Sequence, residues 1–203
     1  AFSGELYADL IGGGAGLIEL SAAAPLPTAV VAEEIARLGP ADLAGRVQGS
    51  GYLPSGLPEL RERIAELHTA QGLPTRADAV LVTTGAQQAI GLVTTLFGEA
   101  GQAVLMEEAT YPGALDMVRA GAMRPVGVPL DAGGVVVDAL EDLLDRVRPR
   151  FAYLVPAHQN PTGSVLSEAR SRRVAELSAR YRVPVVEDLA LRDLRMSARP
   201  VPA

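Results

Sequence analysis

Three turns and one acidic residue of this sequence carry groups that can bind a phosphorylated aromatic ring. The first turn holds Gly85, Ala86 and Gln87 at the predicted start of a helix, where free backbone N–H groups attract phosphate. A glycine there lets a ligand approach the backbone closely. A tight strand-to-helix turn without a ligand accounts for these residues equally well, so this turn alone leaves both interpretations open.

The next two turns supply an aromatic ring and an amide. Tyr111 follows a predicted strand, and its ring can lie against a planar ligand, although such a tyrosine is more often a packed residue at a helix start. Asn160 opens the turn Asn160-Pro161-Thr162-Gly163, which fixes its side-chain amide so that it can donate to a ring oxygen. Turns of this composition are also common without a ligand.

The acidic residue is Asp188, which lies beside Glu187 after the apolar segment 183–186. An aspartate held at a strand end can keep a pyridine nitrogen protonated, and the protonated ring then withdraws electrons from a neighbouring carbanion. A lone acid at this place is more often a helix cap. Asn160 and Asp188 follow successive apolar segments, and taken together with all three turns Asp188 is interpreted as the electrostatic partner of the bound ring.

The elements that must position these residues alternate between short apolar strands and helices. This alternation predicts an α/β fold with a mostly parallel sheet and helices on both of its faces. Ligands of such sheets bind beyond the carboxyl ends of the strands, which is where all four segments lie. Strands are predicted at 80–84, 103–106, 125–129, 152–155 and 184–186, and helices at 87–97, 112–120, 137–147 and 167–181.

The N-terminal part of the chain has a different pattern. Residues 1–18 are predicted to be a linker, because Gly12 to Gly16 is a run that disfavours regular structure. A dinucleotide-binding loop is the alternative, but Leu17 stands where its third glycine belongs. Residues 19–75 are predicted to form an arm with helices at about 28–38 and 58–68.

Composition restricts the possible functions. Of the 203 residues, 48% are hydrophobic and 21% are charged, as in ordinary globular domains. A net charge of -6 and a pI near 5.0 argue against direct binding of nucleic acid by this segment. No apolar run is long enough to span a bilayer, and neither a membrane contact nor a metal site is predicted. The absence of cysteine fits a reducing compartment, so a cytoplasmic location is expected.

Taken in order, these segments resemble the class I and II aminotransferases of fold type I, which use pyridoxal 5'-phosphate. The resemblance extends from about residue 20 to about residue 194, and it rests on the ordered set rather than on any one motif. It implies that Asn160 binds the phenolic oxygen of the cofactor and that Asp188 pairs with the ring nitrogen. It also implies that Gly85, Ala86 and Gln87 bind the cofactor phosphate and that Tyr111 stacks on the ring. The segment Tyr52-Leu53-Pro54-Ser55-Gly56, with Leu60-Arg61, completes the set, and Tyr52 is implied to reach the phosphate of a neighbouring subunit.

The sequence also departs from this family. Many members place a tyrosine two or three residues after the aspartate, where this chain has Ala190 and Leu191. The chain contains no lysine, whereas the family holds its cofactor as a Schiff base on a lysine amine. Arg192 cannot replace that amine, because arginine does not lose its proton. Residues 76–203 are therefore expected to be the first part of a cofactor-binding large domain that stops before the lysine.

Within the superfamily, the residues of the segments at 51–58, 72–76 and 186–191 are most similar to those of the MocR-type regulators of the GntR family. This resemblance implies a cofactor-binding sensor domain of a transcription regulator that works as a homodimer and senses a small amino acid or amine. Two other interpretations stay open: a piece of an amino-acid aminotransferase, and a pseudo-enzyme that serves only for dimerisation. For the chain as given, we expect no transamination and at most weak, noncovalent binding of pyridoxal phosphate.

Overall fold

The computed structural model describes residues 29–39 and 50–194. Within these residues the chain divides into two compact units. The larger contains residues 71–73 and 83–194, and the smaller contains residues 29–39, 50–70 and 74–82. The predicted linker, with its glycine run, lies outside the described residues.

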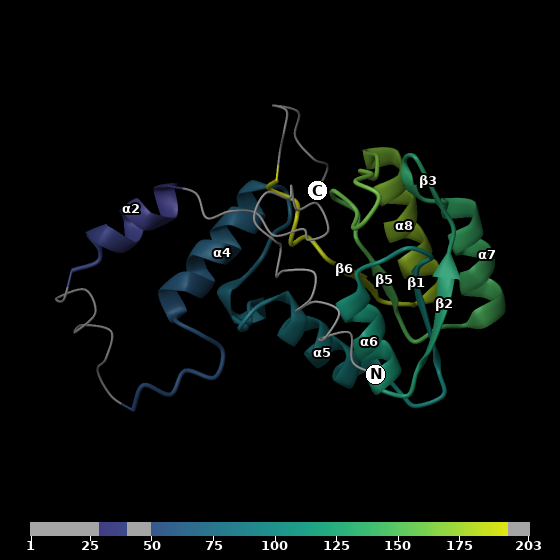
Figure 1. Cartoon of the computed structure of the whole chain (residues 1–203), viewed down its shortest axis with the longest axis horizontal. Helices are drawn as coiled ribbons and strands as arrows, with labels where there is room; N and C mark the ends of the chain where they lie inside the picture. The colour runs from purple at the N-terminus through teal and green to yellow at the C-terminus, as the bar shows by residue number, and fades with distance from the viewer. Residues whose placement is uncertain (1–28, 40–49, 195–203) are drawn as a thin grey trace, which may run out of the picture. The chain divides into compact units, whose positions relative to one another are not determined.

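A four-stranded sheet forms the centre of the larger unit, with its strands in the order β2-β1-β5-β6. All three neighbouring pairs are parallel, so the mostly parallel sheet predicted from the sequence is confirmed (Figure 1). Since β5 and β6 are neighbours, their carboxyl ends open at the same edge of the sheet. The strands are β1 (Ala103–Glu107), β2 (Arg124–Val128), β5 (Ala152–Leu154) and β6 (Val185–Glu187).

Helices cover both faces of this sheet. Alternate residues of a strand point to opposite faces, so Val104 packs in a cluster with α5 and α6, whereas Leu105 packs in a cluster with α7 and α8. Both side chains are fully buried. The helices are α5 (Ala86–Phe97), α6 (Pro112–Ala120), α7 (Val137–Val147) and α8 (Glu168–Tyr181).

The helices of the larger unit begin and end close to where the sequence predicts them. Pro112 occupies the first turn of α6, a position that needs no backbone N–H. The Ser167 hydroxyl accepts a hydrogen bond from the Arg170 backbone N–H at 3.3 Å and so caps α8. Arg148 and Arg182 end α7 and α8 in the left-handed conformation.

The predicted strand at 80–84 was wrong. Val80 has an extended backbone, but the Val82 N–H donates to the carbonyl of Ser55 instead of to a neighbouring strand. Extended backbone becomes a strand only when a partner strand supplies the ladder of hydrogen bonds, and the described residues supply none here. The residues that follow, 84 and 85, form a bend directly before α5.

A small hairpin was missed by the sequence analysis. Strands β3 (Leu130–Asp131) and β4 (Gly134–Val135) pair in antiparallel fashion. Arg170 of α8 binds both carboxylate oxygens of Asp131 at 2.7 Å and also donates to the carbonyl of Val135. Two-residue strands are too short to show an alternating pattern, so this hairpin leaves little signal in the sequence.

The smaller unit contains α2 (Ala29–Arg37), α4 (Pro58–Ala70) and a 3-10 turn (Ala77–Ala79). Both helices match their predicted positions within two residues. Arg61 of α4 donates from Nε to the carbonyl of Val80 at 2.9 Å, which fixes the chain that leads toward α5. Within the described ranges, no helix has the length and apolar character needed to cross a membrane.

Candidate active site

The predicted phosphate site lies at the N-terminus of α5. Gly85 is the N-cap residue, with a φ of 140° that favours glycine, and a Cβ placed there meets no atom within 4 Å. The turn is held by Gln88, whose side-chain oxygen accepts hydrogen bonds from the backbone N–H and the hydroxyl of Thr84. The first N–H groups of an α-helix have no partner within the helix, so this open end suits an anion.

Gln87 and Tyr111 are brought together by Gly113. The Gln87 amide donates to the carbonyl of Gly113 at 3.1 Å, and Tyr111 is the N-cap residue of α6. A Cβ at Gly113 would lie 2.6 Å from the Tyr111 ring and would also collide with the Gln87 side-chain oxygen. Glycine is therefore required for the N-termini of α5 and α6 to pack in this way.

Asp188 follows β6 and is held in place from three sides. Its backbone N–H donates to the carbonyl of Leu154 at 2.9 Å, which continues the parallel ladder with β5. The Tyr153 hydroxyl donates to Oδ2 at 2.6 Å, and the Ala190 N–H donates to Oδ1 at 3.0 Å. The carboxylate is thus oriented before any ligand binds.

Tyr153 is a site residue that the sequence analysis treated only as part of a strand. Its side chain is fully buried, and burial, together with the hydrogen bond to Asp188, raises the pKa of its hydroxyl above the ordinary range. Tyr153 therefore stays protonated and serves as a hydrogen-bond donor. An inward-facing tyrosine in an apolar run is the only signal that the sequence offers for this role.

The turn that carries Asn160 is anchored through its neighbour Gln159. The buried Gln159 amide donates from Nε2 to Glu107 Oε2 at 2.8 Å and to the carbonyl of Ala109 at 2.6 Å. Its Oε1 accepts from the N–H and the hydroxyl of Thr162 at 2.9 and 2.7 Å. Both donors and the acceptor of this amide are satisfied, so the turn is fixed to the end of β1.

Glu107 is a buried acidic residue of the larger unit. It is 3% exposed at the end of β1, and its Oε1 also accepts from the Val155 N–H at 3.2 Å. Burial raises the pKa of Glu107 from 4.5 to about 7, although the two hydrogen bonds act in the opposite direction. The negative charge of Asp188 adds to the increase, which places the two acids within electrostatic reach.

Two polar atoms flank this network without a hydrogen-bond partner among the described residues. They are Thr110 Oγ1, after β1, and His158 Nε2, after β5. Buried polar atoms are rarely left unsatisfied in a folded protein, so their presence fits a site that takes a polar ligand or water. Together with the open N-terminus of α5 and the oriented Asp188, they fit a phosphorylated pyridine ring.

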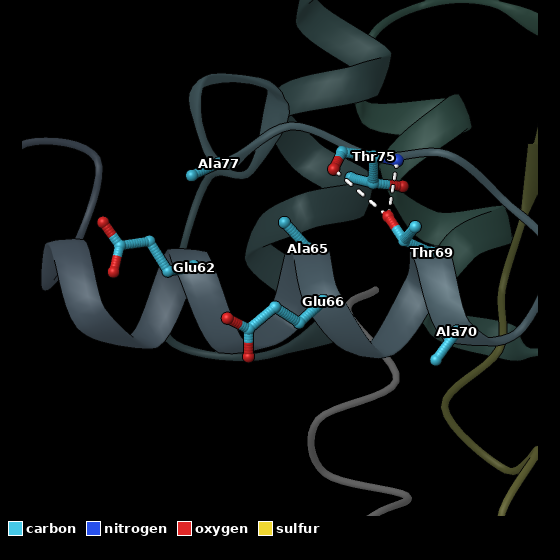
Figure 2. Close-up of a pocket in the computed structure, with 7 residues that line it drawn as sticks. All are labelled: Glu62, Ala65, Glu66, Thr69, Ala70, Thr75 and Ala77. Atoms are coloured by element: carbon cyan, nitrogen blue, oxygen red, sulfur yellow. Dashed lines mark hydrogen bonds between the residues drawn. The ribbon is translucent and has the colours of Figure 1, made fainter.

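Tyr52 belongs to the smaller unit, and its side chain is 79% exposed. Its predicted contact with the phosphate of a neighbouring subunit stays a prediction. The smaller unit also has a hollow of about 510 Å³ along α4, in which Figure 2 shows two hydrogen bonds between Thr69 and Thr75. The hollow is lined by small residues and two glutamates, and it contains none of the predicted site residues.

These features define an α/β domain of the fold type I class, with a candidate site at the carboxyl ends of its parallel strands. Residues 14–199 match the family model described as "Aminotransferase class I and II", and the chain belongs to this family. A 2-aminoadipate transaminase of Thermus thermophilus is 34% identical over 93% of this chain. An HTH-type transcriptional regulator of Bacillus subtilis, YisV, is 30% identical over 80% of it. The chain spans 47% and 36% of these two relatives, so about half of their length or less.

Solved structures show the same similarity. The alpha-aminoadipate aminotransferase LysN of T. thermophilus, complexed with N-(5'-phosphopyridoxyl)-L-leucine, is 38% identical, with a TM-score of 0.63 over 73% of this chain and 39% of its own. The multiple substrate aminotransferase of Thermococcus profundus has a TM-score of 0.82 at 25% identity, over 100% of this chain and 52% of its own. The resemblance to aminotransferases is thus confirmed by relatives and by solved structures, and the resemblance to HTH-type transcriptional regulators is confirmed by relatives.

Proposed function

We propose that this chain is part of a sensor domain that binds pyridoxal phosphate in a MocR-type transcription regulator of the GntR family. The observation that carries the cofactor assignment is the orientation of Asp188 by Tyr153 and Ala190 at the end of β6. A carboxylate held in this way can accept a hydrogen bond from a protonated ring nitrogen. Tyr153 keeps its own hydroxyl proton and donates it in a hydrogen bond to Asp188, so Tyr153 does not take the proton of the ring nitrogen.

The other predicted residues would hold the remaining parts of the ligand. The N–H groups at Gly85, Ala86 and Gln87 would bind the phosphate, since the Gln87 side chain is already engaged with Gly113. The ring of Tyr111 would stack on the pyridine ring, and the Asn160 amide would donate to the phenolic oxygen. When bound, pyridoxal phosphate supplies an electron-withdrawing ring and an aldehyde that reacts with amines.

This chain supplies no lysine for a covalent link. Phosphate, stacking and hydrogen-bond contacts remain, so the chain as given binds the cofactor weakly and reversibly and performs no transamination. Arg192 does not change this conclusion, because its guanidinium does not deprotonate.

The regulator is favoured by the relatives that are named as HTH-type transcriptional regulators. HTH-type regulators of B. subtilis and Escherichia coli recur among them, at 30% and 32% identity over 80% and 68% of this chain. The residues that follow Asp188 fit this assignment, since Ala190 and Leu191 lack the hydroxyl that many enzymes of the family place there.

An amino-acid aminotransferase is the second candidate, and the 34% identity to a 2-aminoadipate transaminase over 93% of this chain favours it. Either protein would work as a homodimer, because the role proposed for Tyr52 requires a second subunit. Apolar side chains that α2 leaves exposed within the described residues support such an association. They are Val30, Val31 and Ile35, at 62%, 50% and 63% exposure.

Extending the reading frame in both directions separates the two candidates. A winged-helix segment upstream together with a lysine downstream would support the regulator. A short upstream start, with a lysine and a carboxylate-binding arginine downstream, would instead support the aminotransferase.

A further inference from the structure

We propose that Glu107 and Gln159 form a buried latch that positions the Asn160 turn for ligand binding. The inference rests on the proposed cofactor site, because Asn160 is assigned there to the phenolic oxygen. Glu107 touches no ligand group in this proposal. It is a positioning residue that acts through Gln159.

The latch joins the end of β1 to the segment that follows β5, about 50 residues further along the chain. Glu107 ends β1, Val155 follows β5, and Gln159 lies one residue before Asn160. The two Glu107 oxygens accept from the Val155 N–H and from the Gln159 amide, so one side chain fixes both ends of the short segment between them. Glu107 and Gln159 are 3% and 2% exposed, which shields these bonds from water.

The turn beyond Gln159 is held by the side-chain amide of Gln159 and by its backbone carbonyl. Gln159 Oε1 holds Thr162, and the Gln159 backbone carbonyl accepts from the Gly163 N–H at 2.6 Å. Asn160 and Pro161 lie inside this ring of bonds. A rotation of the Gln159 side chain would therefore release the turn at Thr162 and shift Asn160 with it.

The latch requires two acceptors on residue 107, and the ionised carboxylate of Glu107, which predominates above pH 7, supplies both. Both groups that face the carboxyl oxygens, the Val155 N–H and the Gln159 NH2, are donors. A glutamine at this position has the same shape but carries one acceptor and one donor. In either orientation its NH2 group faces one of the two donors, the Val155 N–H or the Gln159 NH2, and no hydrogen bond forms there. The variant Glu107→Gln therefore removes one latch bond without creating a cavity.

The matched control is Glu108→Gln, the same chemical change one residue away. Glu108 Oε1 accepts from the Leu130 N–H at 3.1 Å, and an amide oxygen can accept this bond equally well. A second, milder variant is Thr162→Val, which removes the exposed hydroxyl that donates to Gln159. It tests the latch from its other end if Glu107→Gln folds poorly.

The first readout is amide hydrogen exchange of the ligand-free chain, measured above pH 7, where Glu107 is ionised. In Glu107→Gln, the amides of Thr162 and Gly163 should exchange about tenfold faster, as expected for the loss of one buried hydrogen bond. The amide of Asp188, which bonds to Leu154, should be unchanged. The second readout is titration with pyridoxamine 5'-phosphate, which has no aldehyde and so reports noncovalent binding alone. Its affinity should fall about tenfold in Glu107→Gln, less in Thr162→Val, and not at all in Glu108→Gln.

Each outcome gives a decision. Faster exchange in the turn together with weaker binding supports the latch. Unchanged exchange at Thr162 and Gly163 overturns it, whatever the titration gives. Faster exchange with unchanged affinity shows that the latch does not position a ligand group and also overturns the inference. If the unaltered chain does not bind pyridoxamine phosphate, the proposed function fails, and with it the ligand-positioning role of the latch, even where exchange shows that the bonds exist.

Discussion

The hydroxyl of Tyr153 donates a 2.6 Å hydrogen bond to Oδ2 of Asp188, linking the interior of β5 to the acid that follows β6. The bond joins residues 35 positions apart, and it forms because β5 and β6 are parallel neighbours in register. It orients a carboxylate at the sheet edge where the fold places ligands. This chain lacks the tyrosine that many family members place two or three residues after the aspartate. Tyr153 supplies a tyrosine hydroxyl beside Asp188, but this hydroxyl bonds the carboxylate.

Replacing Tyr153 by phenylalanine should weaken both the fold and the site. The variant leaves Asp188 Oδ2 without its donor, and a hydrogen bond to a charged group is worth about 1.5–3 kcal/mol. We expect urea unfolding to show a loss in this range and pyridoxamine phosphate to bind less tightly. Tyr181→Phe on α8 is the control for the chemical change. Equal stability of the Tyr153→Phe and unaltered chains would mean that the bond contributes nothing.

Gly113→Ala should disrupt the junction of α5 and α6. The added methyl group would lie 2.6 Å from the Tyr111 ring, so Tyr111 and Gln87 must both move. We expect a loss of about 1–3 kcal/mol, typical of overpacking, measured by chemical denaturation. Gly91→Ala is the control in α5, because its Cβ would meet only Met117 Sδ at 3.9 Å. That change should stabilise the protein by up to about 1 kcal/mol, and a similar loss in both variants would contradict the account.

Stability should fall as pH rises from about 4.5 to about 7, because of Glu107. Its pKa is about 7 in the folded protein and 4.5 in the ordinary exposed state, so in this window the folded state binds the extra proton. The stabilisation is complete below pH 4.5 and is lost as pH rises through 7, amounting to about 3 kcal/mol at 1.36 kcal/mol per pKa unit.

The measurement is the free energy of unfolding at several pH values for the unaltered chain and for Glu107→Gln. The variant should have a shallower slope between pH 4.5 and 7, whereas Glu108→Gln should keep the original slope. Identical slopes in Glu107→Gln and the unaltered chain would show that Glu107 does not titrate in this range. Asp131 acts in the opposite sense at lower pH. Its pKa is lowered to about 2 by Arg170, so its stabilisation is lost as pH falls from 3.8 through 2.

Arg170→Met should loosen the β3–β4 hairpin, although the Arg170 side chain is only partly buried. The bidentate contact with Asp131 is the main link that the structure shows between this hairpin and α8. We expect faster amide exchange at Gly133, which donates to Asp131, and a small decrease of the denaturation midpoint that shrinks at high salt. Arg172→Met, which breaks an exposed pair with Glu168, should leave the hairpin unchanged. Equal exchange at Gly133 in both variants would contradict the assigned role of Arg170.

The sequence predicts the sheet and its helices well because their signals are local. Pro112 and Ser167 mark helix starts, and the apolar run around Tyr153 marks a buried strand. The extended segment at Val80 was assigned to a strand because its residue types fit one, but a strand exists only with a partner, and residue types do not show a partner. Such pairing is a property of the fold.

The sequence predicts the turns of the candidate site, but it does not predict the residues that hold these turns in place. Asn160 and Asp188 follow strand ends and are recognised by their position. Glu107, Gln159 and Tyr153 act through hydrogen bonds across 35 to 52 residues of sequence, which no local pattern reveals. A glutamate at the end of an apolar strand is nevertheless a usable signal, because a charge in that setting requires partners.

The most direct test of the central claim is the affinity of this chain for pyridoxamine 5'-phosphate before and after Asp188→Asn. Asparagine keeps the shape of the side chain but removes the charge that pairs with a protonated ring nitrogen. We predict saturable binding by the unaltered chain, a loss of about tenfold or more in Asp188→Asn, and no change in the exposed control Asp193→Asn. Equal affinity of Asp188→Asn and the unaltered chain, or no saturable binding by the unaltered chain, would contradict a cofactor site at the carboxyl ends of these strands.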